Sequence, residues 1–240
     1  GGQPLLIIGV AATIRSIRTK PRWLELGYML LLAGLACIPF LVGERLDRWL
    51  SGLMLAVLIL FLYQLLARER NDGKLQQEDD RPKASASGWI LNSAMLGAGF
   101  LMLMYGAEWL VGGASQVASD MGMSKTMIGA TVVAIGTSMP ELATSAVAAM
   151  RGQSEICIGN IIGSNIFNIG AVLGGAGILQ PFAFDADPLM LVTIGVATAS
   201  ALILAALLRK SGGVSRSVGI LFLLTYAGYM TYAVIAKSGA

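Results

Sequence analysis

The sequence contains no histidine, few charged residues and only two cysteines. The absence of histidine excludes a His-ligated metal, a histidine general base and a Ser-His-Asp triad. The cysteines, Cys37 and Cys157, lie inside apolar runs and are too few for a disulfide framework. Charged residues make up 13% of the 240 residues, against about 25% in soluble domains. What remains is a chain dominated by apolar side chains.

Apolar residues make up 55% of the chain, and the mean hydropathy is +0.71. A soluble domain of this size could not hide so much apolar surface from water, so we expect an all-α polytopic membrane protein. A bilayer core of ~30 Å needs about 20 helical residues. Seven runs meet this length, and residues 5–14 resemble the tail of an eighth, so the chain is expected to begin part-way through a span. The seven runs are 25–43, 49–67, 89–113, 125–150, 155–181, 188–208 and 214–236.

The basic residues are distributed unevenly between the two sets of loops that these runs define. Thirteen of the 17 fall on one side, which the positive-inside rule assigns to the cytoplasm. The polar stretch 68–88 lies on that side and is interpreted as a cytoplasmic linker. It divides the chain into 1–67, part of a first helical half, and 89–240, a second half whose C-terminus lies outside. The expected location is a bacterial inner membrane.

Two carboxylates lie inside predicted spans, Glu108 and Glu141. A carboxylate within a bilayer is a functional candidate by default. Glu108 stands beside Trp109 near the end of its span, where an interfacial anchor or a packing role is the simpler interpretation. Glu141 lies in the middle of its run, directly after Pro140. It is therefore the stronger candidate for a functional site.

The residues before Glu141 predict an interrupted helix. Pro140 has no N–H, so the carbonyl of Gly136 loses its helical partner. Unpaired backbone groups at membrane depth are tolerated where they line a cavity or bind something. Thr137 and Ser138 add hydroxyl groups to the freed carbonyls. Such a set of oxygen ligands without Cys or His suits Na⁺ or Ca²⁺.

The next run carries a second polar cluster, GNIIGSNIFN at 159–168. Asn160, Ser164 and Asn168 follow at four-residue spacing and share one helix face, with Asn165 beside them. Gly159 and Gly163 form a G-x-x-x-G step that is expected to let another helix approach closely. Two discontinuous helices that meet near the midplane are the usual ion site of a secondary transporter.

These two segments resemble the α-repeat of the calcium/cation antiporter superfamily, the sodium/calcium exchangers and their prokaryotic relatives. The family pattern G-T-S-x-P-E matches Gly136–Glu141, and G-N-x-x-G-S-N-x-x-[ND] matches Gly159–Asn168. The resemblance implies an inverted-repeat exchanger fold of ten helices in two halves. It implies exchange of Na⁺ or H⁺, and sometimes K⁺, for Ca²⁺.

Carried over by position, the resemblance makes Glu141 a bidentate Ca²⁺ ligand that Na⁺ shares. It adds oxygens from Thr137 and Ser138, the carbonyl of Ala134, and the side chains of Ser164 and Asn168. Gly136, Pro140, Asn160, Gly163 and Asn165 would support these ligands or the helix break. The potassium-dependent branch typically has Asp where this chain has Asn168, which disfavours K⁺ co-transport.

The start of the chain resembles the end of a first α-repeat. Placing Gly9 over Gly174 aligns residues 5–17 with 170–182 and puts Gln3 opposite Asn168. Residues 1–4 do not match the family motif, so the first half is incomplete, and the rest of the first repeat is expected in the full-length chain. A single carboxylate leaves a dehydrated Ca²⁺ with a net charge of +1, whereas two neutralise it.

The function expected is therefore a cation antiporter that uses alternating access at one midplane site. The alternative is a non-transporting membrane subunit, or an inactive half-exchanger that lacks the first repeat. An enzyme is not expected, because no span holds a nucleophile–base pair or an Asp pair. The expected partners are inorganic cations and the lipid bilayer. Nucleic acid is not expected, since the basic residues flank spans, and no cofactor is expected beyond the transported ions.

Overall fold

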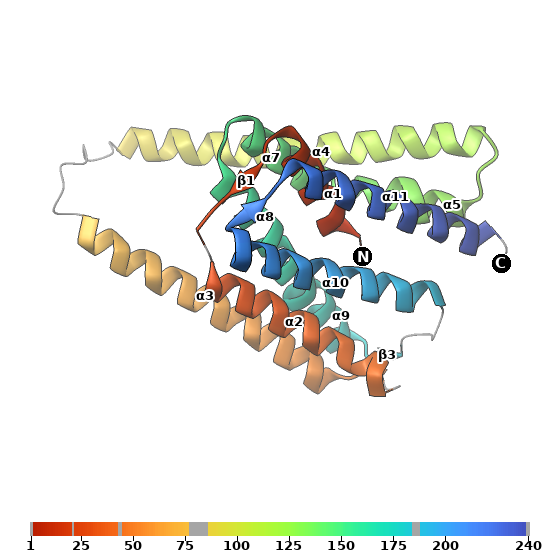
Figure 1. Ribbon diagram of the computed structural model, residues 1–240, viewed down its shortest axis with the longest axis horizontal. Coiled ribbons are helices and arrows are strands. Elements are labelled where there is room, and N and C mark those ends of the chain that lie inside the picture. Colours follow the sequence, from red (N-terminus) through yellow and green to blue (C-terminus); the bar gives the residue numbers. More distant parts are fainter. Residues whose placement is uncertain (1, 21, 43–44, 77–85, 184–187, 239–240) are drawn as a thin grey trace.

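The computed structural model describes residues 2–20, 22–42, 45–76, 86–183 and 188–238. The long helices run in roughly one direction, and the loops that connect them gather at two opposite ends (Figure 1). The helices in chain order are α1 (Gln3–Ile14), α2 (Trp23–Val42), α3 (Arg48–Gln76), α4 (Ala86–Asp120), α5 (Lys125–Ile128), α6 (Ala134–Gly136), α7 (Met139–Met150), α8 (Ser154–Phe167), α9 (Gly174–Leu179), α10 (Pro188–Ser211) and α11 (Arg216–Ser238), with two π-helical stretches, η1 (Gly129–Val133) and η2 (Asn168–Leu173).

Six of the predicted runs are helices long and apolar enough to cross a membrane. The seventh, 125–150, is divided into α5, η1, α6 and α7. The run at 155–181 is one uninterrupted span of 26 residues, because α8, η2 and α9 follow one another directly. It therefore bends through a π-helical stretch and is not broken, unlike the discontinuous helix expected there. Within the predicted linker 68–88, α3 continues to Gln76 and α4 begins at Ala86. The residues between them lie outside the described part.

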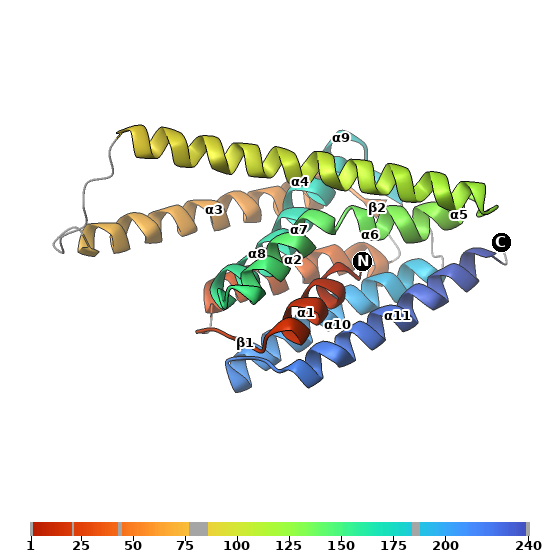
Figure 2. The same cartoon turned by 90° about the horizontal axis from the view of Figure 1, so that it is seen from above.

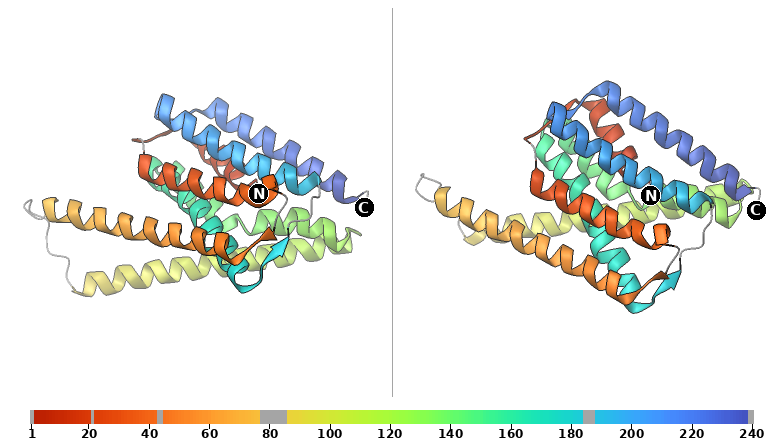
Figure 3. Two further views of the ribbon diagram at one scale, coloured as in Figure 1. Left: turned by 90° about the horizontal axis from the view of Figure 1, so that it is seen from below. Right: turned by 60° about the horizontal axis from the view of Figure 1, so that its bottom comes forward.

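Two short antiparallel strand pairs join loops that are far apart in the sequence. β1 (Ile17–Arg18) pairs with β4 (Gly213–Val214), and β2 (Arg45–Leu46) pairs with β3 (Phe182–Ala183). The pairs lie at opposite ends of the helices (Figure 1; Figure 3). The alignment of Gly9 with Gly174 places β1 over β3, so equivalent strands lie at opposite ends. This arrangement is what an inverted repeat requires.

The contacts between helices show the same internal repeat as the strand pairs. α1 packs against α11, and the equivalent stretch η2–α9 packs against α3. A Cβ atom built on Gly9 would lie 3.1 Å from the carbonyl oxygen of Gly219. One built on Gly174 would lie 3.1 Å from the carbonyl oxygen of Ser51. Glycine is needed at both positions because the facing backbone leaves no room for a side chain. The sequence alignment therefore corresponds to a repeated close contact.

The core lies between α1, α2, α8 and α10, where the largest buried side chains are found. α11, α10, α2 and α3 lie next to one another in that order (Figure 3). α4 lies along the edge of the molecule (Figure 2), and most of its apolar stretch is exposed, with Ala118 buried near its end. The polar cluster 159–168 thus begins on α8, one of the helices that form the core. The fully buried side chains of α8 are Cys157, Ile158, Ile161, Ile162 and Ile166.

Candidate cation site

The helix that carries the G-T-S-x-P-E motif is interrupted at Thr137 and Ser138, between α6 and α7. The last bonds of the first segment run from the N–H of Thr137 to the carbonyl of Val133, at 2.9 Å, and from the N–H of Ser138 to the carbonyl of Ile135, at 3.0 Å. Pro140 lies in the first turn of α7 and has no N–H to give to Gly136. The predicted break is therefore present, two to three residues before the proline.

Three oxygen atoms gather at the end of α6. The carbonyl of Ala134 accepts hydrogen bonds from Oγ1 of Thr137 at 3.2 Å and from Oγ of Ser138 at 3.5 Å. Ser138 is buried, whereas Thr137 is exposed at the protein surface. These residues are consecutive or nearly so, and the break turns their oxygens toward one another. A cation that binds the carbonyl oxygen of Ala134 would compete with the hydroxyl hydrogens of Thr137 and Ser138 for that oxygen.

Glu141 lies in the first turn of α7, close to this cluster. Its Oε2 atom is buried and makes no hydrogen bond with any residue that the structure describes. The N-terminus of α7 carries a partial positive charge, which stabilises a carboxylate in the first turn. A buried carboxylate oxygen without a donor is nevertheless costly. Oε2 of Glu141 is therefore a buried polar atom whose partner is not among the described residues.

Asn160 connects α8 to this first turn of α7. Its Nδ2 donates to the backbone carbonyl of Glu141 at 3.0 Å and to Oγ of Ser145 at 2.9 Å. Ser145 is completely buried. The sequence interpretation missed Ser145, although its position four residues after Glu141 places it on the same helix face. The amide of Asn160 therefore fixes the backbone that carries the carboxylate.

The remaining polar residues of α8 divide into two groups. Oγ of Ser164 and Nδ2 of Asn165 both donate to the carbonyl of Ile161, at 3.1 and 2.8 Å, so they bond within their own helix. Asn168, the first residue of η2, donates from Nδ2 to Oε1 of Gln3 on α1 at 3.2 Å. The residues that the sequence alignment placed opposite each other thus meet across the two repeats.

The glycines of the motifs contact different partners from those expected. A Cβ atom on Gly163 would meet nothing within 4 Å among the described residues, and one on Gly159 would meet the guanidinium of Arg22. Among the described residues no helix occupies the space beside Gly163, so the close helix approach expected at this G-x-x-x-G step stays a prediction. Gly136 does lie against a helix, since a Cβ atom there would overlap with Val111 of α4. Glu108, also on α4, is exposed at the edge of the molecule.

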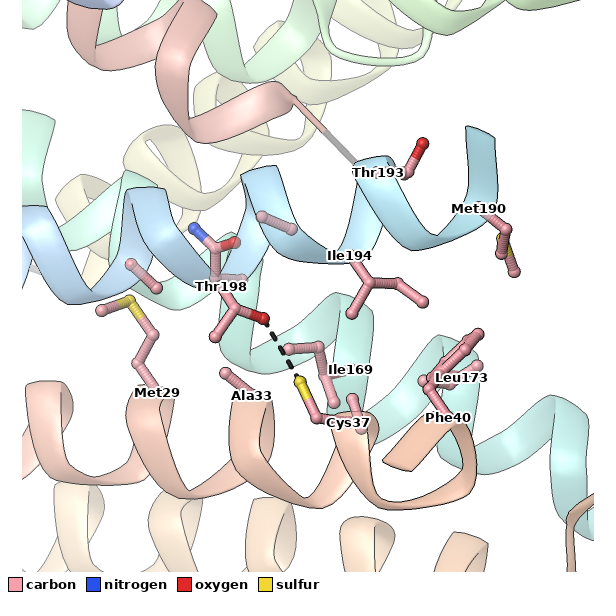
Figure 4. Close-up of a pocket in the computed structure, with 14 residues that line it drawn as sticks. Met29, Ala33, Cys37, Phe40, Ile169, Leu173, Met190, Thr193, Ile194 and Thr198 are labelled. Atoms are coloured by element: carbon pink, nitrogen blue, oxygen red, sulfur yellow. Dashed lines mark hydrogen bonds between the residues drawn. The ribbon is translucent and has the colours of Figure 1, made fainter. Parts of the chain in front are cut away.

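A second region, between α2, α10 and the α8–η2 stretch, is a largely apolar cavity. It has a volume of about 230 Å³, and Ile169 and Leu173 line it (Figure 4). Its visible polar contact joins Sγ of Cys37 and Oγ1 of Thr198 at 3.3 Å. It contains no carboxylate. In the described residues, no three His, Cys, Asp or Glu side chains come together. Glu141 and its neighbouring oxygens remain the arrangement best suited to a hard cation.

Comparison with known proteins identifies the family of this chain. The family model described as sodium/calcium exchanger protein matches residues 91–235. CaxA of Alkalimonas amylolytica is 33% identical over 244 residues, which cover 94% of this chain and 72% of CaxA. The inner membrane protein YrbG of Escherichia coli K12 is 33% identical over 231 residues, covering 90% of this chain and 69% of YrbG.

A solved structure shows the same fold. The sodium/calcium exchanger from Methanococcus jannaschii superposes with a TM-score of 0.75 at 25% identity, over 96% of this chain and 73% of that protein. The fold and the apolar helices define an integral membrane transporter built from inverted repeats. The chain belongs to the sodium/calcium exchanger family.

Proposed function

We propose that this protein exchanges Ca²⁺ for Na⁺ or H⁺ by alternating access at a single site centred on Glu141. The observation that carries the proposal is the buried Oε2 atom of Glu141, which has no donor among the described residues and lies beside a broken helix. Calcium and sodium both prefer oxygen ligands, and the surrounding groups offer carbonyl, hydroxyl and amide oxygens. A proton can bind the same carboxylate.

The proposed ligands are Glu141 and five further groups. Those groups are the carbonyl of Ala134, the hydroxyls of Thr137, Ser138 and Ser164, and the amide oxygen of Asn168. The hydroxyls now bond to backbone carbonyls at 3.1 to 3.5 Å. A hydroxyl oxygen keeps its lone pairs while its hydrogen is donated, so these groups can coordinate a cation without losing those bonds.

Competition between the ions for one carboxylate couples the two fluxes. If the buried charge has to be neutralised before the protein can change its access, neither ion crosses without the other moving in exchange. One carboxylate leaves Ca²⁺ with a residual charge of +1 in a medium of low dielectric constant. Full neutralisation therefore needs a second anionic group.

The decisive experiment is Ca²⁺ uptake into proteoliposomes driven by an outward Na⁺ gradient, and separately by a pH gradient without Na⁺. Glu141→Gln is expected to reduce uptake to background in both cases. The variant should unfold no earlier than the parent, because it removes a buried charge without removing a hydrogen bond of Oε2. Glu108→Gln, the same change at an exposed carboxylate on α4, is the matched control and should retain uptake. Uptake that survives in Glu141→Gln would contradict the proposal.

The single carboxylate also supports a second candidate, a membrane subunit that does not transport by itself. It predicts no uptake for the chain alone and uptake after a partner with an intramembrane carboxylate is co-expressed. We further propose that the end rich in basic residues faces the cytoplasm of a bacterial inner membrane. A C-terminal reporter that is active only outside the cytoplasm tests this orientation, because residue 240 is then external.

A further inference from the structure

The strand pair β1–β4 forms one wall of a pocket at the basic end of the molecule. The pocket has a volume of about 230 Å³ and lies between the start of β1 and the turn that joins α10 to α11. Its floor is apolar, since Ile17 and Val214 are buried. Its rim is polar and exposed, with Ser16 and Arg18 on one side and Ser215 on the other.

The segments around the pocket carry only positive charge. Residues 13–22 and 205–220 contain no Asp or Glu and include seven basic residues, Arg15, Arg18, Lys20, Arg22, Arg209, Lys210 and Arg216. In the described part of the chain, the ion pair at this end joins Arg22 to Glu25 at 3.1 Å. Arg18 has no carboxylate partner there. Among the described residues, Arg18 beside the pocket therefore has no counter-charge in ion-pair contact.

Several groups on the rim can donate hydrogen bonds to an anion. Oγ of Ser215 accepts from the N–H of Val218 at 3.4 Å, which leaves the hydroxyl hydrogen of Ser215 available. α11 begins at Arg216, so the first N–H groups of this 23-residue helix point toward the same end. The backbone N–H of Arg18 bonds to Oγ of Ser154 at 3.3 Å, which holds β1 against α8. The backbone of β1, which bears the Arg18 side chain, is therefore held in place.

The position of the pocket relative to the membrane indicates which anion it binds. α10 and α11 are both long enough to span a membrane, and the pocket lies between the end of one and the start of the other. This depth corresponds to the lipid headgroups, where phosphate is the abundant anion. The buried aliphatic floor suits the glycerol and first acyl carbons, which free phosphate lacks. We propose that this pocket binds the headgroup of an anionic phospholipid, with its phosphate on Arg18 and Ser215.

The test is binding of dioleoylphosphatidylglycerol to the detergent-solubilised chain, measured by native mass spectrometry against dioleoylphosphatidylcholine. Arg18→Gln is expected to weaken binding of phosphatidylglycerol about fivefold, as one basic residue is worth about 1 kcal/mol at a membrane surface. Arg18→Gln combined with Ser215→Ala should weaken it further. Arg151→Gln removes the same charge from the same end outside the pocket, and it should weaken binding less than twofold.

Equal losses in Arg18→Gln and Arg151→Gln would overturn the proposal, because they would show diffuse attraction to surface charge. Equal binding of phosphatidylcholine would overturn it as well. Millimolar inorganic phosphate should not displace the lipid, and displacement would mean that the pocket binds free phosphate instead. If Arg18→Gln does not fold, Arg18→Lys keeps the charge but loses the planar fork of donors, and should still weaken binding.

Discussion

The amide of Asn160 provides a quantitative test of how α7 and α8 are held together. It donates two hydrogen bonds, to the carbonyl of Glu141 and to Oγ of the buried Ser145. A hydrogen bond contributes about 0.5–1.5 kcal/mol net in proteins, and about 0.6 kcal/mol on average in a membrane protein. Asn160→Leu should therefore lower the free energy of unfolding by about 1–3 kcal/mol.

The assay is reversible unfolding in mixed detergent micelles, followed by helical circular dichroism. Asn160→Leu, Ser145→Ala and the double variant form a cycle that isolates the bond between the two side chains. We expect a coupling energy of about 1 kcal/mol. Asn165→Leu is the matched control, because Asn165 lies on the same helix but bonds only to the carbonyl of Ile161 in its own turn. Asn165→Leu should lower the free energy of unfolding by less than Asn160→Leu does.

Two results would refute this reasoning. Additive effects within about 0.3 kcal/mol would mean that the two side chains do not stabilise each other. A loss for Asn165→Leu equal to that for Asn160→Leu would mean that any polar residue of α8 has the same effect. A decrease in Ca²⁺ uptake for Asn160→Leu without a change in unfolding would place its role in the geometry of Glu141 alone.

Three further predictions concern the break and the close helix contacts. Pro140→Ala restores a donor for the carbonyl of Gly136, and it should lower Ca²⁺ uptake while changing the free energy of unfolding by less than about 1 kcal/mol, because proline is tolerated in a first turn. Gly136→Ala should destabilise by about 1–3 kcal/mol through overlap with Val111, and Val111→Ala should restore much of that loss; no rescue would mean that α4 does not pack there. Gly219→Leu should separate α1 from α11 and lower the melting temperature, whereas Gly228→Leu on the same helix meets nothing within 4 Å and should be tolerated. Equal effects of these two would contradict the packing.

The sequence allowed the spans, the helix break and the internal repeat to be predicted, because each depends on local or periodic signals. Six apolar runs and the interruption before Pro140 are confirmed. Gln3 and Asn168, which the alignment makes equivalent, are joined by a hydrogen bond that the alignment itself did not predict. The ligand roles of Glu141 and its neighbours remain predictions.

Other features depend on contacts that a single sequence does not encode locally. The role of Ser145 depends on which residue of α8 lies opposite it. The helix contact expected at Gly163 is not found among the described residues, because a small residue permits an approach but does not supply the approaching helix. The π-helical stretches η1 and η2 arise where the helix adjusts to its neighbours, and no residue pattern marks them. Such stretches frequently occur at functional sites, and η2 begins at Asn168.

The pairing of β1 with β4 has a consequence for how the protein is made. Ile17 pairs with Val214, which the ribosome adds about 200 residues later. At about 5–20 residues per second, β4 is synthesised some 10–40 s after β1, so β1 has no partner strand during that time. α11, the helix against which α1 packs, is likewise synthesised about that much later than α1. During this interval the early helices are inserted but lack their final neighbours, and the protein depends on the membrane, or on cellular factors, to keep them from pairing wrongly.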